Sequence, residues 1–145
     1  MTHGLPETEL RPITRKMVEV PGKESHGLWY FAHPYTCRDD DGNYVPAGEQ
    51  ANFVLCCVRA AELLKYGVNV YAPICHTHPI HIHSPQFLQR HEHDIWYKLD
   101  NEFIDLTKWR GIILAPGWKD SPGCRAERKR IQARGLCVLE DYQLV

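Results

Sequence analysis

The 145-residue sequence contains no apolar run that approaches the roughly 20 residues needed to span a bilayer. Its polar N-terminus also lacks the apolar core of a secretory signal peptide. There is no excess of positive charge, since 17 Lys and Arg against 18 Asp and Glu give a formal net charge of −1. Broad electrostatic binding to nucleic acid or to an anionic membrane is therefore not expected. With 43% hydrophobic and 24% charged residues, the composition is typical of a soluble globular protein.

The cysteines do not show the paired spacing that is typical of a disulfide framework. There are six of them, at positions 37, 56, 57, 75, 124 and 137. Cys56 and Cys57 are adjacent within an expected helix, where one of them should point into the core. Reduced thiols are therefore favoured over disulfides, and this predicts a cytoplasmic protein.

Neither an internal repeat nor a low-complexity tract divides the chain, so 145 residues are most simply one domain. Residues 1–26 contain proline residues, a Pro-Gly pair and charges of both signs, and this composition predicts an extended N-terminal arm. The arm could include a short strand at 17–20. Residues 27–145 are expected to form the folded domain.

Strands and helices alternate along this domain. Strands are expected at 28–32, 68–73, 111–115 and 136–139, and helices at 48–66, at about 85–108 with a possible break, and from 121 to about 134. Short connections between alternating elements predict an α/β fold: one doubly wound, flavodoxin- or Rossmann-like domain with a four- to five-stranded parallel sheet.

The segment 117–127 is the most informative part of the chain. Ser121 is a natural helix N-cap, and Pro122 suits the first helical position. Gly123 would let a ligand approach the backbone, where the free N–H groups of a helix start favour an anion. Glu127 follows about a turn and a half later. One interpretation is a phosphorylated substrate with acid or nucleophilic chemistry, and the other is an ordinary capped helix with a solvated Glu127.

Four histidines crowd the segment after the second strand, at positions 76, 78, 81 and 83, with His91 and His93 downstream. We expect this segment to be a loop. Its spacing matches no standard zinc motif, and Pro79 would break a helical register. Substrate contacts or loop-structuring hydrogen bonds are favoured, with solvent exposure and a metal as alternatives. His78 is the best candidate for the pocket, and neither a metal site nor a cofactor is predicted.

Three segments together resemble the nucleoside 2-deoxyribosyltransferase-like superfamily. They are the turn Tyr30-Phe31-Ala32-His33-Pro34-Tyr35, Asp100 in a helix before the third strand, and Ser121-x-Gly-x-x-x-Glu127. The resemblance covers roughly residues 28–140. It is strongest to a small branch with Gly-Trp-x-x-Ser-x-Gly before the Glu and Pro-Ile-x-His-x-His-Pro after the second strand, present here from Gly117 and from Pro73.

The resemblance implies cleavage of the N-glycosidic bond of a nucleoside or nucleotide through a covalent glycosyl-enzyme intermediate. Glu127 would be the nucleophile and Asp100 the acid/base, while Tyr30 would orient the nucleophile or contact the sugar. The helix N-terminus would favour the ionised form of Glu127. The resemblance also implies a homodimer or a larger assembly.

Ser121 separates two activities within this superfamily. Members that act on free nucleosides carry Asp there, whereas members that hydrolyse nucleoside 5′-monophosphates carry Ser, and a carboxylate would indeed repel a phosphate. A nucleoside 5′-monophosphate N-glycosidase is therefore expected. A base-exchanging transferase for free (deoxy)nucleosides and a non-catalytic nucleotide-binding module are the alternatives.

Seven residues are expected to contact the substrate. Trp118 could cover a bound base or simply seal its turn, and His33 replaces the glycine of many members and could reshape the pocket. The seven are His33, Pro34, His78, Gly117, Trp118, Ser121 and Gly123.

Overall fold

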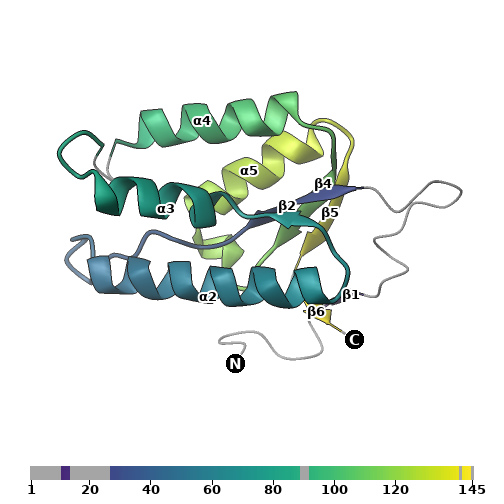
Figure 1. The fold of residues 1–145 in the computed structure, drawn as a ribbon, viewed down its shortest axis with the longest axis horizontal. Helices are drawn as coiled ribbons and strands as arrows, with labels where there is room; N and C mark the ends of the chain where they lie inside the picture. The colour runs from purple at the N-terminus through teal and green to yellow at the C-terminus, as the bar shows by residue number, and fades with distance from the viewer. Residues whose placement is uncertain (1–10, 14–26, 89–91, 141, 145) are drawn as a thin grey trace, which may run out of the picture.

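The fold is built on a four-stranded sheet in which every neighbouring pair is parallel, in the order β3-β2-β4-β5 (Figure 1). It is seen in a computed structural model that describes residues 11–13, 27–88, 92–140 and 142–144. The strands are β2 (Leu28–Ala32), β3 (Val70–Tyr71), β4 (Trp109–Leu114) and β5 (Cys137–Glu140). The predicted α/β fold with a parallel sheet is confirmed.

Helices cover both faces of the sheet, as a doubly wound domain requires. Four α-helices and one short 3-10 helix are described: α2 (Pro46–Lys65), α3 (Pro73–His83), α4 (His93–Leu106), η2 (Trp118–Asp120) and α5 (Pro122–Gln132). In Figure 1, α2 lies on one side of the sheet, and α4 and α5 lie on the other. No helix within the described residues is both long and apolar enough to pass through a lipid bilayer.

Alternate residues of β2 enter two separate core clusters, because successive side chains of a strand point to opposite faces. Trp29 and Phe31 pack with Cys56 and Leu63 of α2 and with Ile113 of β4. On the opposite face, Tyr30 and Ala32 pack with Ile104 of α4, Ile112 of β4 and Ile131 of α5. Tyr30 therefore points into the layer formed by α4 and α5.

The strand order reverses between β2 and β4, and this switch point lies where ligands bind in open α/β sheets. The two loops that leave these strands meet there. The Ala115 N–H donates to the Ala32 carbonyl at 2.9 Å. Gly117 has a φ of +90°, and a Cβ added to it would lie 3.5 Å from Cγ of Pro34. The turn thus depends on a glycine and brings Gly117 and Pro34 together, both predicted to contact substrate.

The expected loop of histidines is wrong, because residues 73–83 form the helix α3. Pro73 occupies the first helical position, and the Thr77 hydroxyl donates to its carbonyl at 3.1 Å. Pro79 lies inside the helix. His78 and His81 are both buried, and this packing outweighs the local cost of an interior proline. The next helix, α4, begins only at His93, eight residues later than expected.

A second, two-stranded parallel sheet joins the two ends of the chain. It pairs β1 (Arg11–Ile13) with β6 (Tyr142–Leu144). The segment expected to be an N-terminal arm thus contributes a strand, but at 11–13. The strand expected at 17–20 lies outside the described residues.

Candidate functional site

A tyrosine from the sheet and a glutamate from α5 form the centre of the candidate site. The Tyr30 hydroxyl donates a hydrogen bond to Oε2 of Glu127, and the Tyr30 side chain is fully buried. Glu127 lies in the second turn of α5, on the side that faces the sheet. This contact argues against the interpretation of Glu127 as a solvated side chain on a capped helix.

Asp100 of α4 is the third member of this cluster. It is only partly exposed, and its charge raises the pKa of both Glu127 and Tyr30. The structure therefore brings together the three residues predicted to be catalytic, each from a different element. They form a carboxylate pair with a phenol beside it.

Burial changes the charge state of both carboxyls. It raises the pKa of Asp100 to about 7 and, with the nearby Asp100 charge, raises that of Glu127 to about 8, although the Tyr30 hydrogen bond opposes this rise. Burial and the Asp100 charge thus oppose the ionised form of Glu127 that the helix N-terminus is expected to favour. The pair retains a proton near neutral pH, so one carboxyl can act as an acid while the other carries the charge.

Tyr71 belongs to the same cluster and was missed by the sequence reasoning. It lies opposite Tyr30 in the β2–β3 pairing and stacks on Phe103 of α4, with ring centroids 5.0 Å apart. Burial and the Asp100 charge raise its pKa to about 12, so it stays a neutral hydrogen-bonding group. The sequence signal that could have identified Tyr71 is its position at the end of the expected second strand, next to β2 in the sheet.

The predicted cap of α5 is confirmed. Ser121 accepts a hydrogen bond from the Cys124 N–H at 3.3 Å, and Pro122 is the first helical residue. A Cβ on Gly123 would meet only Ser121 Oγ, at 4.0 Å, so the backbone there is open on its outer side. The Cys124 and Arg125 N–H groups donate to Ser121, so the Gly123 N–H is the group of the first turn that a ligand can reach.

Trp118 is packed into the core cluster of the α4–α5 face and is 8% exposed. The Arg128 guanidinium lies over its ring, 5.2 Å from the centroid. These contacts support the interpretation that Trp118 seals the turn. Its indole N–H is buried without a hydrogen-bond partner in the described part of the chain.

His33 lies on the α2 side of the sheet, where Arg59 donates to its Nε2 at 2.9 Å and its Nδ1 donates to the Pro34 carbonyl at 2.8 Å. Burial lowers the pKa of His33 to about 4, so the ring is neutral. Both nitrogens have protein partners, and the ring braces the turn after β2. Substrate contact by His33 stays a prediction.

His78 is also engaged on both nitrogens, by the Tyr35 hydroxyl at 2.6 Å and by Oε1 of Gln50 at 2.7 Å. Its ring stacks on Phe53, with centroids 4.4 Å apart. These bonds support a structuring role for His78, and the bond to Gln50 joins α3 to α2. Contact of His78 with substrate stays a prediction, and His91 lies outside the described residues.

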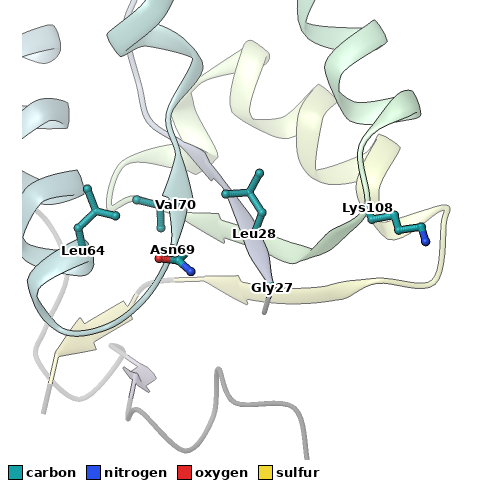
Figure 2. A pocket seen from close by; sticks show the side chains of 6 residues that line it. All are labelled: Gly27, Leu28, Leu64, Asn69, Val70 and Lys108. Atoms are coloured by element: carbon teal, nitrogen blue, oxygen red, sulfur yellow. The ribbon is translucent and has the colours of Figure 1, made fainter. Parts of the chain in front are cut away.

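No group of three or more His, Cys, Asp or Glu side chains in the described ranges is arranged to hold a metal ion. The surface also has an open pocket at the opposite end of the sheet, where β2, β3 and β4 begin (Figure 2). It is lined by Gly27, Leu28, Leu64, Asn69, Val70 and Lys108. With one ionisable side chain, Lys108, this pocket offers no acid–base pair, so the carboxylate cluster remains the candidate active site.

The raised carboxyl pKa values predict a stability that falls as pH rises. The unfolded chain loses these protons near pH 4, whereas the folded protein holds them up to about pH 7 or 8. Folding therefore loses up to about 1.4 kcal/mol per pH unit for each group across this window. Glu127→Gln removes the Glu127 contribution to this loss. Between pH 5 and pH 8 its free energy of unfolding should therefore rise relative to that of wild type, by up to about 4 kcal/mol.

Denaturant unfolding at both pH values would check this. Asp105→Asn is the control with the opposite sign, because the Arg130 hydrogen bond lowers the Asp105 pKa and any stabilisation from that pair is lost as pH falls. A stability difference between Glu127→Gln and wild type that did not change with pH would mean that Glu127 ionises normally in the folded state.

The site can be compared with known proteins. No curated protein sequence matches the chain. Residues 27–142, about four fifths of the chain, match a family model described as "Domain of unknown function (DUF1937)". The matched region contains Tyr30, Asp100 and Glu127. The chain therefore belongs to the family described as Domain of unknown function (DUF1937).

Proposed function

We propose that the protein is an N-glycosidase that cleaves the bond between base and sugar in a nucleoside 5′-monophosphate. The observation that carries the proposal is the cluster of Glu127, Asp100 and Tyr30, in which the Tyr30 side chain is fully buried and the two carboxyl side chains are partly exposed. Two neighbouring carboxyls with pKa values of about 7 and about 8 together hold about one proton near neutral pH. Glu127 has the higher pKa, so the proton lies mainly on Glu127 in the unliganded protein and has to pass to Asp100 before Glu127 acts as the nucleophile and Asp100 as the acid.

The proposed reaction has two steps. In the first, a carboxylate oxygen of Glu127 attacks the anomeric carbon, the glycosidic C–N bond breaks, and Asp100 gives its proton to the departing base. In the second, Asp100 takes a proton from water, which displaces Glu127 and releases the sugar phosphate. Asp100 is then protonated again, and Glu127 is a carboxylate again.

Tyr30 would help in both steps through its hydrogen bond to Glu127. Its own pKa is raised well above the usual value by burial and by the two carboxylates, so it stays a donor. Donation to Glu127 stabilises its carboxylate form, which attacks in the first step and leaves in the second, and fixes the direction of its oxygens. Tyr71 is also neutral, lies next to Tyr30 on β3 and is close enough to Asp100 for that charge to raise its pKa, and we propose that it contacts the sugar.

The phosphate would be bound at the start of α5. Ser121 supplies a hydroxyl, and the open backbone at Gly123 lets a phosphate oxygen reach the Gly123 N–H. Pro34 and Gly117 form the adjoining wall at the switch point. This arrangement favours a monophosphate over a free nucleoside, the substrate of the transferase alternative.

The proposal is tested with two substrate panels, one of ribo- and deoxyribonucleoside 5′-monophosphates and one of the matching nucleosides. Chromatography should detect free base from at least one monophosphate and little from the nucleosides. Base exchange from nucleosides after addition of a second base would establish the transferase instead. Nucleotide binding by calorimetry without base release would establish the non-catalytic module, although a pure binder has little use for two carboxyls beside a phosphate.

The proposal places the enzyme in the cytoplasm, where its six free cysteines would stay reduced. It also includes a homo-oligomer. A row of apolar side chains runs along the outer surface of α2, with Val54, Leu55 and Val58 each between 41% and 49% exposed. These residues lie on the side opposite Cys56 and Leu63, which face the core. A second copy of the chain is the proposed partner for this row.

Val58→Glu should disrupt that association, because it places a charge in the middle of the apolar row. Light scattering should give a multiple of 16.8 kDa for wild type and a single chain for the variant. Lys129→Glu, on the exposed surface of α5, is the control and should keep the wild-type mass. A wild-type protein that is monomeric at micromolar concentration would rule out the oligomer.

A further inference from the structure

Three thiols from two helices meet beside, but not within, the candidate active site. Cys56 and Cys57 belong to α2, and Cys75 lies in the first turn of α3. Sγ of Cys75 is 3.4 Å from that of Cys57 and 3.8 Å from that of Cys56. The proposed glycosidase mechanism uses none of them.

The surroundings of Cys75 favour a thiolate. As the third residue of α3, after Pro73, it lies where the helix dipole stabilises negative charge. Hydrogen bonding with the Cys56 and Cys57 sulfurs lowers its pKa to about 6, even though burial opposes this. Burial and the neighbouring Cys75 raise the pKa of Cys57 to about 11. The pair is therefore asymmetric, with one reactive thiolate and one protonated thiol in contact.

Exposure distinguishes the two neighbours of Cys75. Cys57 and Cys75 are both partly exposed, whereas Cys56 is completely buried. A small oxidant can therefore reach Cys75, and Cys57 is the partner with the shorter sulfur–sulfur distance. A disulfide has an S–S length of about 2.05 Å, so the two sulfurs need to approach by a little more than 1 Å.

We propose that Cys75 and Cys57 form a peroxide-sensitive dithiol that closes into a disulfide between α3 and α2. The Cys75 thiolate attacks one oxygen of the peroxide, the O–O bond breaks, and hydroxide leaves to give a sulfenic acid. The Cys57 sulfur then attacks the Cys75 sulfur, the S–O bond breaks, and water leaves with the Cys57 proton. Two electrons pass from the two sulfurs to the peroxide, and two waters form once the hydroxide is protonated.

Oxidation of this dithiol should change the electrostatics of the candidate active site. The Cys75 charge raises the pKa of Tyr71, whose pKa is also raised by Asp100. Oxidation removes that charge and ties α3, with His78 and His81, to α2. The dithiol itself does not depend on the glycosidase proposal, because its formation is measured on the thiols alone.

The first test is the reactivity of the reduced protein toward iodoacetamide at pH 6.5. A thiol with a pKa near 6 is mostly thiolate there, against about 1% for one with the reference value near 8.5, although a less basic thiolate is also less nucleophilic. Cys75 should react roughly five- to tenfold faster than the exposed Cys137. Equal rates, or a slower Cys75, would overturn the proposal.

The second test treats the full-length protein with equimolar hydrogen peroxide and maps its peptides without reduction. A linked Cys57–Cys75 peptide is expected in wild type and in the control Cys137→Ser, and its loss in Cys75→Ser. Cys57→Ser should leave a sulfenic acid on Cys75 that dimedone traps, which keeps the test valid if Cys75→Ser folds poorly. No linked peptide, or a link from Cys75 to Cys56, would overturn the assignment.

Discussion

Glu127→Gln should lower the rate of base release from the preferred monophosphate by at least about 10³-fold. The amide keeps the size of the side chain and can still contact the Tyr30 hydroxyl, but it cannot form the glycosyl ester. The loss should therefore appear in kcat, with nucleotide binding retained. Single-turnover assays that separate base release from binding would measure it.

Glu102→Gln is the matched control, since Glu102 is exposed on α4, the helix that carries Asp100. It should leave base release within about twofold of wild type. Base release by Glu127→Gln at the wild-type rate would exclude Glu127 as the nucleophile, whatever the other residues do.

Ser121→Asp should lower turnover of the monophosphate by one to several orders of magnitude. The variant places a carboxylate against the substrate phosphate and removes a hydroxyl donor, and such a change costs about 2–5 kcal/mol. The helix cap should survive, because Asp accepts the Cys124 N–H bond as well as Ser does. Activity on the unphosphorylated nucleoside should be retained or should increase. Steady-state assays on both substrates would measure the change in preference.

Ser121→Asn is the control that separates charge from shape, because Asn also caps helices but stays neutral. It should retain far more monophosphate turnover than Ser121→Asp. Equal losses on nucleotide and nucleoside, or undiminished turnover in Ser121→Asp, would mean that Ser121 is only a cap and that any phosphate binds elsewhere.

Much of the fold is readable from local signals. The apolar run at 28–32 corresponds to β2 residue for residue. The helix α5 begins after Ser121 with Pro122, as the capping preferences of these two residue types predict. The carboxylate cluster follows from topology, because Tyr30 faces the layer that contains α4 and α5. The motif at 117–127 and the switch-point rule indicate this end of the sheet, whereas Asp100 and Tyr30 are identified only by the family resemblance.

What the sequence could not give depends on tertiary packing. α3 forms despite Pro79, because His78 and His81 are buried and both hydrogen-bond to the Tyr35 hydroxyl, while His78 also hydrogen-bonds to Gln50 of α2. The spacing of apolar residues predicted α2, but not that Val54 and Val58 would stay on its outer surface. The raised pKa of Glu127 reflects desolvation, which no local pattern reports.

The cluster of thiols was hidden for the same reason. Cys57 and Cys75 are 18 residues apart and meet only because α2 and α3 pack together. Tyr71 likewise joins the carboxylates only through the pairing of β3 with β2.

The configuration of the sugar product tests the covalent mechanism most directly. The measurement is proton NMR of the methyl glycoside formed when the enzyme cleaves its preferred monophosphate in dilute methanol. Attack by Glu127 followed by attack of methanol inverts the anomeric carbon twice, so the account predicts a methyl glycoside with the β configuration of the substrate. A product of α configuration would show direct displacement by solvent and would contradict the role proposed for Glu127, as would the absence of base release from every nucleotide tested.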